Sequence, residues 1–316
     1  MSILSRPLFT DTYDNLYSFT PDKNSTYIFS SGEECRSKPP KNWRTKQHCD
    51  FLSITETENS VIFHTQEGEI ERSIRGQASL TSTLHDITKE VIYIDITGMG
   101  HNTWAPLLKC SLETQKTIIC VYSEPKSYRF SNVPTEGTIF DLSTKISGIR
   151  PIAGFSNLRD PDSKKVCFIP LLGFEGARLA YTLQQLEPSP PIIPIIGAPG
   201  FMLEYPSYSY WGNKNVLHPS EIWRDIKYTP AHCPFSLYYT LLDIKHTYPN
   251  HFLRIAPIGT KPHGLGSILY ALLNHDNTEI IYDNPIRKGG RTSGQARVHT
   301  YHISQSIPAL LKLRNG

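Results

Sequence analysis

The segment "IGTKPHGLG", residues 258–266, has the residue types that could bind a phosphate. An apolar run ends there and another begins, which predicts a strand followed by a helix. Thr260 can cap that helix, so that backbone N–H groups and the helix dipole attract an anion. Lys261 adds a positive charge, His263 can add a donor, and Gly264 permits close approach. We interpret the loop as a phosphate or ribose-phosphate site; an ordinary turn between strand and helix is the alternative.

A second glycine-rich loop, "DITGMGHNTW", also follows an apolar run. Gly98 and Gly100 resemble the start of a dinucleotide-binding fingerprint, although Thr103 stands where its third glycine would be. His101 and Asn102 could read a base or a sugar of a bound ligand. Alternatively, Asn102 or Thr103 serves only as the cap of the following helix.

Two basic segments could contact a polyanion. The densest is "IRKGGRTSGQAR", and it follows a third apolar run, so that we expect a cationic flap over a phosphate site. The other, residues 36–46, has Trp43 among its cations, which suits a stacked base. Nucleic acid is therefore a partner to consider through 36–46 and 287–297, and solvated loops are the alternative. The predicted flap cations are Arg287, Lys288 and Arg291.

Two further segments follow apolar runs. "GAPGFMLEYPSYSYWGN" is rich in aromatic residues and reads as a loop that stacks a base or packs over the core. In "LLGFEGARLAY", Glu175 lies at a predicted helix start, where a carboxylate suits the helix dipole, and Arg178 lies in the first turn. A structural role is the prediction for both residues.

An enzymatic reading is also open. Asp95 with Glu124, Pro125 and Lys126 mimics the D…ExK pattern of metal-dependent nucleases. The two carboxylates would hold Mg²⁺, and the lysine would assist a water. Pro125 interrupts the strand that normally carries ExK, which weighs against this reading. The sequence contains no HExxH, no G-x-S-x-G and no cysteine–histidine cluster with zinc spacing.

The elements that must position these residues are predicted to form an α/β fold. Residues 1–88 are polar and suggest a small N-terminal α+β or β-rich domain. Residues 89–316 contain three βαβ-type units, each with a continuous apolar run, a glycine loop, a helix and a strand that ends at proline. Such runs are typical of strands buried on both faces, so we expect a Rossmann-like, doubly wound, mainly parallel sheet. The loops after Thr97, Leu172 and Ile258 would then face one crevice.

The two glycine loops give the chain a resemblance to a known family. "PIGTKPHGLGSILYAL" and "IDITGMGHNTW" are similar to motifs of the CARF-type Rossmann-like domains of prokaryotic defence systems. The resemblance implies a Rossmann-like fold that dimerises and senses a nucleotide second messenger, often cyclic oligoadenylate. It implies that the ligand contacts are Thr97, Gly98, Gly259, Thr260 and Lys261.

Composition limits the function classes. The 316 residues carry a formal charge of +3, which gives no general argument for nucleic-acid binding. Six cysteines without a CxxC pair and no apolar run long enough to span a bilayer predict a cytoplasmic protein with reduced thiols.

We therefore expect a nucleotide- or phosphate-sensing component of a bacterial anti-phage or conflict system. It would form a homo-oligomer and work with a partner protein encoded nearby. One alternative is an enzyme on a nucleotide or phosphosugar, with Mg²⁺ as cofactor; another is a structural subunit of a defence complex.

Overall fold

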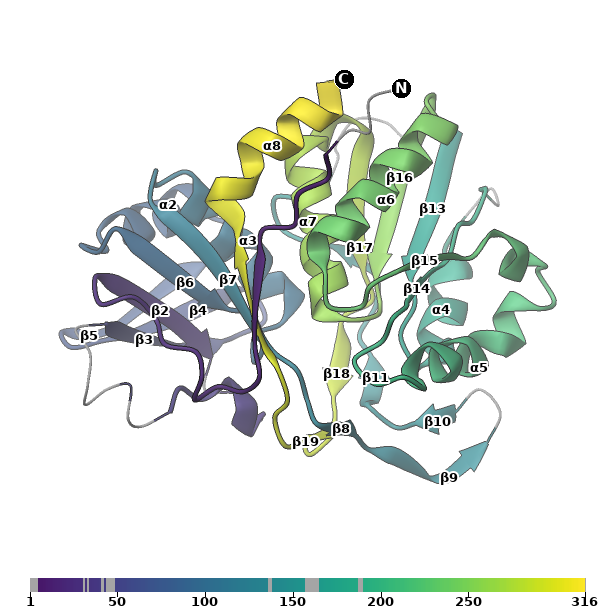
Figure 1. Ribbon diagram of the computed structural model, residues 1–316, viewed down its shortest axis with the longest axis horizontal. Coiled ribbons are helices and arrows are strands. Elements are labelled where there is room, and N and C mark those ends of the chain that lie inside the picture. Colours follow the sequence, from purple (N-terminus) through teal and green to yellow (C-terminus); the bar gives the residue numbers. More distant parts are fainter. Residues whose placement is uncertain are drawn as a thin grey trace. The chain divides into compact units, whose positions relative to one another are not determined.

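The chain folds into two compact units. The computed structural model describes all residues except 1–4, 31, 33, 41–42, 44–48, 136–137, 157–164, 187–189 and 316. Unit 1 comprises Met1–Ser127 and Thr292–Gly316, and unit 2 comprises Tyr128–Arg291 (Figure 1). The chain passes between the units at the short strands β8 (Ser127–Tyr128) and β19 (Thr292–Ser293). This division differs from the predicted boundary after residue 88.

Unit 1 contains an eight-stranded mixed sheet in the order β1-β20-β7-β6-β2-β3-β4-β5. The strands β3, β2, β6 and β7 are parallel, and the outer pairings are antiparallel. The bounds are β1 (Thr10–Tyr13), β20 (Val298–His302), β7 (Thr117–Ser123), β6 (Val91–Asp95), β2 (Ser25–Ser30), β3 (Asp50–Glu56), β4 (Ser60–Thr65) and β5 (Gly68–Ser73). Because β2 pairs with β6, the first 88 residues share a sheet with the segment that follows them.

The sheet of unit 1 has an aromatic core on one face. Tyr27 of β2 packs on Tyr93 of β6, with Phe19 and Trp43 edge-on to these rings. Trp104 of α3 is also fully buried, but it does not belong to this aromatic cluster. The helices of this unit are η1 (Cys35–Ser37), α2 (Gln77–His85), α3 (His101–Leu112) and α8 (Ile303–Asn315).

Unit 2 contains a six-stranded, mainly parallel sheet in the order β12-β17-β16-β13-β14-β15. Only β12, at one edge, is antiparallel to its neighbour. The chain runs from β13 outward to β14 and β15, then returns to the other side of β13 with β16 and β17, so the strand order reverses between β13 and β16. The bounds are β12 (Arg150–Pro151), β13 (Lys165–Leu171), β14 (Ile195–Gly197), β15 (Lys227–Thr229), β16 (His251–Pro257) and β17 (Thr278–Tyr282).

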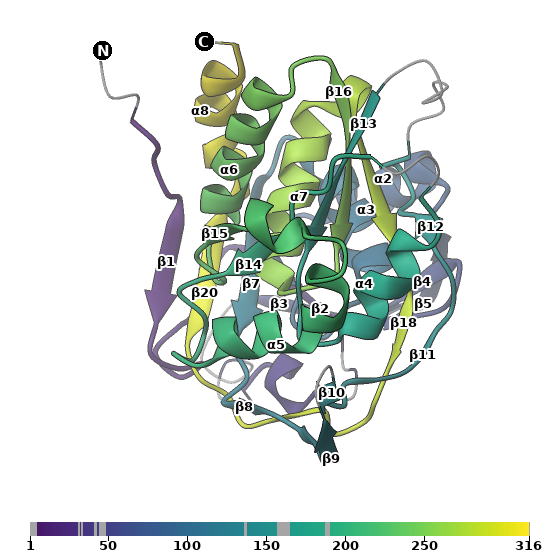
Figure 2. The ribbon, with the colours of Figure 1, turned by 90° about the vertical axis from the view of Figure 1, so that its right-hand side faces the viewer.

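Helices alternate with the parallel strands of unit 2. They are α4 (Gly176–Leu183), α5 (Tyr205–Leu217), η3 (Ile222–Asp225), α6 (Pro234–Thr247), α7 (Lys261–Leu273) and η4 (His275–Asn277). Helix α4 packs against α5, and α6 packs against α7 (Figure 2). The remaining strands are β9 (Phe130–Thr135), β10 (Thr138–Phe140), β11 (Ser143–Ile146) and β18 (Pro285–Arg287). Among the described residues, no helix has the length and apolar character that a membrane crossing requires.

The α/β class and a mainly parallel sheet with interleaved helices are confirmed for unit 2. Two finer expectations are wrong. The three predicted βαβ units do not share a sheet, because the strands that flank the loop after Thr97 belong to unit 1. The aromatic segment is not a loop throughout, because it forms helix α5 from Tyr205 onward; Pro206, with its fixed φ, lies at the helix start.

Candidate functional site

The loops after β13 and β16 touch at the carboxyl ends of these two strands. A Cβ atom on Gly173 would lie 2.9 Å from the carbonyl oxygen of Ile258, and one on Gly259 would lie 2.5 Å from that of Leu172. Both distances are too short for any side chain, so glycine is needed here for close backbone approach. The contact lies at the reversal of strand order, where open α/β sheets bind their ligands.

Helix α7 begins at Lys261, two residues after Gly259, and the side chain of Thr260 caps its first turn. The Oγ1 of Thr260 accepts a hydrogen bond from the N–H of His263 (3.3 Å) and donates one to the carbonyl oxygen of Ala231 (2.8 Å). The predicted cap is therefore confirmed. Pro262 has no N–H, so fewer amides face an anion than the sequence suggests. The backbone of residues 259–261 lies at this end of the helix, and Lys261, the first residue of α7, is only 7% exposed.

His263 has a different environment from the predicted one. Its residue is 1% exposed, and its Nε2 lies 3.1 Å from the carbonyl oxygen of Pro230. Burial lowers the pKa of this imidazole to about 4, although the carbonyl groups of Pro230 and Thr229 oppose the change. The ring is neutral at pH 7, and the donor expected for a ligand is directed at Pro230 instead. Gly264 is likewise buried in the first turns of α7.

A buried ion pair supports the loop from the other side. The guanidinium of Arg178, in α4, makes two 2.6 Å bonds to the carboxylate of Asp283 and one of 2.8 Å to the carbonyl oxygen of Ile258. Burial disfavours the charged guanidinium, but Asp283 outweighs it and raises the pKa of Arg178. Arg178 thus joins the ends of β16 and β17 next to Gly259. The sequence pointed to a structural role for Arg178 but did not indicate Asp283, which follows β17 directly.

The cationic segment is anchored within unit 2. Lys288 forms an ion pair with Asp141, and its N–H donates to the carbonyl oxygen of Leu142 (2.9 Å). Strand β18, which carries Arg287, pairs with β11. Glu175 holds the same stretch, because its carboxylate accepts bonds from the N–H of Leu142 (3.2 Å) and from the N–H (2.9 Å) and hydroxyl (2.8 Å) of Ser143. The predicted flap is therefore tied to the segment 141–143, with Arg287 and Arg291 both half-buried.

The aromatic side chains at the start of α5 pack on one another. Phe140 stacks on Phe174 with their ring centroids 4.3 Å apart, and Tyr205 and Tyr208 lie edge-on to Phe140. These contacts favour the packing alternative over base stacking for this segment.

The unit 1 residues predicted to bind a ligand lie around the end of β6. The carboxylate of Asp95 accepts bonds of 2.9 Å from the N–H of Thr97 and the hydroxyl of Tyr27. A Cβ atom on Gly98 would lie 2.9 Å from the carbonyl oxygen of Ser30, so this glycine also permits close packing. His101 stands at the start of α3 with its ring 5.2 Å from that of Trp104, and Asn102 follows it in the first turn.

The N-terminus of α3 already faces a carboxylate of the chain. Glu56, the last residue of β3, accepts a 2.7 Å hydrogen bond from the N–H of Gly100. That N–H is one of the groups that would otherwise be offered to an anionic ligand. One amide fewer is therefore available to an anion at the start of α3.

Glu124 lies in a buried cluster at the end of β7. Its carboxylate accepts bonds from Arg297 (3.0 and 3.1 Å) and lies 2.8 Å from Nε2 of His299. Lys126, two residues on, donates its N–H to the carbonyl oxygen of Ser293 (3.1 Å). Within the described part of the chain, no group of three or more histidine, cysteine, aspartate or glutamate residues could hold a metal ion. Asp95 and Glu124 are thus each bonded to other residues of unit 1.

We expect the Glu124 cluster to make unit 1 sensitive to acid. Burial alone would raise the pKa of the Glu124 carboxyl, but the bonds from His299 and Arg297 outweigh burial and lower it from 4.5. A lowered pKa means stability that is complete above pH 4.5 and is lost as the pH falls below it. Urea unfolding at pH 7 and pH 3.5 should show Glu124→Gln less stable than wild type by about 2 kcal/mol at pH 7, with a smaller difference at pH 3.5. An equal difference at both pH values would contradict this.

The basic segment 36–46 is described only in part. Arg36 is buried, donates to the carbonyl oxygen of Ser123 and forms an ion pair with Glu34. Trp43 belongs to the aromatic core of unit 1. The Trp43 ring packs edge-on against Phe19 and Tyr27, which favours a role in the core over a stacked base, and a nucleic-acid contact of segment 36–46 stays a prediction. The cations Lys41, Arg44 and Lys46 lie outside the described residues.

Comparison of the chain with protein-family models, with curated proteins and with solved structures gives no match. The function of the chain is therefore inferred from its α/β fold and from the geometry of the loops at the start of α7 and α4.

Proposed function

We propose that the chain binds a phosphorylated, nucleotide-type ligand in unit 2, as a sensor of a bacterial conflict system. The ligand's phosphate lies beside Lys261 and the start of α7, at the carboxyl ends of β13 and β16. The observation that carries the proposal is the contact of the Gly173 and Gly259 loops at the point where the strand order reverses.

Three features support this proposal. The order β15-β14-β13-β16-β17 matches the first five strands of a Rossmann-like, doubly wound sheet, in which phosphates bind at helix N-termini. Lys261, a cationic residue, is the first residue of α7. This loop is also similar to the CARF-type motif. That similarity leads us to expect that the ligand is a nucleotide messenger and that the protein forms a homodimer.

We prefer a protein that senses its ligand to an enzyme that converts it. The carboxylates of Asp95 and Glu124, which the enzymatic alternative requires, bond to other residues of unit 1. The interpretation as a subunit that needs a partner protein remains compatible with ligand binding, because a sensor must pass its signal on.

The test is a binding measurement with a charge-removing variant. Native mass spectrometry after exposure to a bacterial nucleotide extract identifies the ligand, and calorimetry measures its affinity. Lys261→Met keeps the buried aliphatic bulk and removes the charge, so we expect affinity to fall about tenfold or more. Lys214→Ala, on α5, is the matched control and should bind as wild type does. A folded Lys261→Met variant with unchanged affinity would exclude this site.

A further inference from the structure

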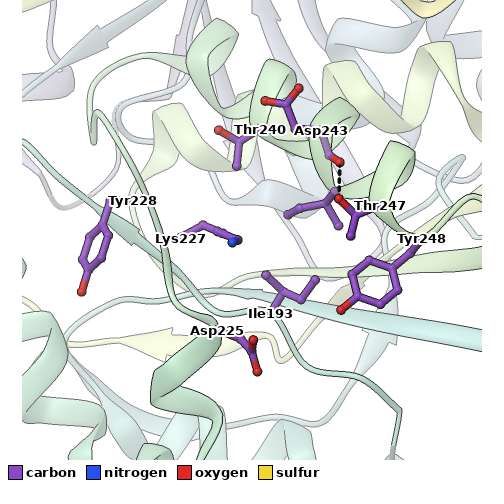
Figure 3. Close-up of a pocket in the computed structure, with 9 residues that line it drawn as sticks. Ile193, Asp225, Lys227, Tyr228, Thr240, Asp243, Thr247 and Tyr248 are labelled. Atoms are coloured by element: carbon purple, nitrogen blue, oxygen red, sulfur yellow. Dashed lines mark hydrogen bonds between the residues drawn. The ribbon is translucent and has the colours of Figure 1, made fainter.

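The cavity of unit 2, of about 350 Å³, has two threonines in its wall (Figure 3). The hydroxyl of Thr247 donates to the carbonyl oxygen of Asp243 (3.0 Å), and that of Thr240 donates to the carbonyl oxygen of Ser236 (3.0 Å). Both hydroxyls therefore serve the backbone of α6, and neither meets a base. A hydroxyl that does meet a base lies in unit 1, on strand β1.

Thr12 of β1, His299 of β20 and Glu124, which follows β7, form a hydrogen-bonded chain in unit 1. Oγ1 of Thr12 lies 3.0 Å from Nδ1 of His299, and Nε2 of the same ring lies 2.8 Å from Oε1 of Glu124. An ionised carboxylate only accepts hydrogen bonds, so the Nε2 of a neutral ring carries the proton. Nδ1 is then the acceptor, and the hydroxyl of Thr12 donates to it. This is the order of groups in a hydroxyl–imidazole–carboxylate triad, which activates a hydroxyl as a nucleophile.

The base and the carboxylate of this chain are held in place by burial. The side chain of His299 is 0% exposed and that of Glu124 is 2% exposed, and Arg297 bonds to the same carboxylate (3.0 Å). The ring of Tyr301 stacks on that of His299, with the centroids 6.1 Å apart. Thr12, by contrast, is exposed. Thr12 is thus the member of the chain that a reagent can reach, and a preorganised pair supports it.

A second contact between the same residue types shows what burial adds. On strands β3 to β5, Oγ1 of Thr55 lies 2.8 Å from Nε2 of His64, and Nδ1 of that ring lies 3.1 Å from Oε1 of Glu69. The side chain of Glu69 is 69% exposed. Water competes for such a carboxylate, so the carboxylate does little to orient the ring. Thr55 therefore serves as an internal comparison for Thr12.

The backbone at Thr12 is also open on one side. In the described chain, β1 is the edge of its sheet. The N–H of His302 donates to the carbonyl oxygen of Phe9 (3.0 Å), and hydrogen-bonded pairs alternate along an antiparallel ladder, so Thr12 and His299 form a non-hydrogen-bonded pair. The N–H of Thr12 therefore points away from β20. It belongs to the same residue as the hydroxyl, where an N–H can bond the oxygen of an attacked carbonyl group.

We propose that Thr12 is a nucleophile that accepts an acyl group from an activated ester, such as a thioester, with His299 as its base. The O–H bond of Thr12 breaks, its proton goes to Nδ1 of His299, and Oγ1 bonds to the carbonyl carbon. The bond from that carbon to the leaving group breaks, and the leaving group departs as an anion with the electron pair. The imidazolium keeps the proton and is stabilised by Glu124. The proposal does not rest on the phosphate site of unit 2.

The burial of His299 decides the class of substrate. A base that the chain covers takes the proton of Thr12 but does not reach the leaving group, so it cannot protonate an amine. Amides are therefore excluded, and the acyl donor needs a leaving group that is stable as an anion, such as a thiolate. The same covered ring does not activate a water. The acyl group therefore stays on Thr12, and the reaction stops after one equivalent.

The experiment treats the full chain with p-nitrophenyl acetate, whose leaving group departs as a coloured anion. We expect a burst of one equivalent of p-nitrophenolate and an acetyl group that peptide mass spectrometry maps to Thr12. Thr12→Val should lose the burst, and Thr12→Ser should keep it. His299→Gln should slow the acetylation of Thr12 by about tenfold or more. Thr10→Val, on the same strand, and Thr55→Val are the matched controls and should react as wild type does.

Two variants separate the action of Glu124 on His299 from a role in stability. Glu124→Gln and Arg297→Gln both break the ion pair between these side chains, so both should lower the melting temperature. Only Glu124→Gln removes the carboxylate that stabilises the imidazolium, so acetylation of Thr12 should slow in that variant and not in Arg297→Gln. Equal slowing in both variants would overturn the role of the carboxylate.

Thermal melts confirm that each variant is folded at the temperature of the reaction. Acetylation of Thr55 or of lysines without Thr12 would overturn the proposal. Acetylation of Thr12 at an unchanged rate in His299→Gln would overturn the assignment of the base. Release of p-nitrophenolate that continues beyond one equivalent would overturn the conclusion that Thr12 keeps its acyl group.

Discussion

Replacement of Gly212 by alanine is expected to destabilise unit 2 severely. Gly212 lies inside helix α5, where alanine is normally favoured over glycine by about 1 kcal/mol. Here the added Cβ would lie 2.1 Å from the carbonyl oxygen of Phe174, a backbone atom that cannot move aside without displacing the Gly173 loop. We expect a loss of about 3 kcal/mol or more, which lowers the melting temperature of unit 2 by about 6–10 °C.

The matched control is Asn215→Ala, on the exposed side of the same helix. It should leave the melting temperature unchanged or raise it slightly, because only helix propensity acts there. Thermal melts followed by circular dichroism measure both variants. A stabilised Gly212→Ala variant would mean that α5 and the Phe174 backbone are not in close contact.

Replacement of Arg178 by methionine is expected to cost about 3–5 kcal/mol, because it leaves the carboxylate of Asp283 buried without its cation. The side chain of Asp283 is 1% exposed, so solvent cannot replace the guanidinium. The carbonyl oxygen of Ile258 also loses its donor, and the Gly259 loop is freed on one side. Urea unfolding curves measure the loss of stability, and phosphate-ligand affinity should fall with it.

The double variant Arg178→Met with Asp283→Leu tests the cause. Removal of both charges should restore most of the stability lost in the single variant, since no unpaired charge remains. A double variant whose loss equals the sum of the two single losses would show that the ion pair itself contributes little.

The sequence predicted the strands that are apolar on both faces. "VCFIPLL" and "LRIAPI" became β13 and β16, and the glycine after each lies where the two loops meet. The run "VIYID" has the same character, yet it pairs with β2 in the other unit. An apolar run shows that a strand is buried, but it does not show which strand lies next to it. That information is in pairings between distant segments, which local pattern does not contain.

For the candidate site, too, the local features could be predicted from the sequence and the remote contacts could not. The cap at Thr260 follows from residue type and position, and the structure confirms it. The partners that change the chemistry are remote in sequence: Asp283 pairs with Arg178 from 105 residues away, and Pro230 faces His263 from 33. From sequence alone, a histidine in a glycine-rich loop suggests a ligand contact. The structure shows that the ring of His263 instead faces the carbonyl oxygen of Pro230.

The division of the chain has a consequence for the order of folding. Unit 2 is one continuous segment, and the N–H of Arg129 donates to the carbonyl oxygen of Arg291 at 2.9 Å, so its own ends meet. Strand β20 of unit 1 pairs with β7 across that whole insertion. If unit 2 folds first, the entropy of closing this long loop falls to that of a short one. During synthesis, the edge of β7 that pairs with β20 therefore stays unpaired until all of unit 2 has been made, and an unpaired strand edge is a template for association with other chains.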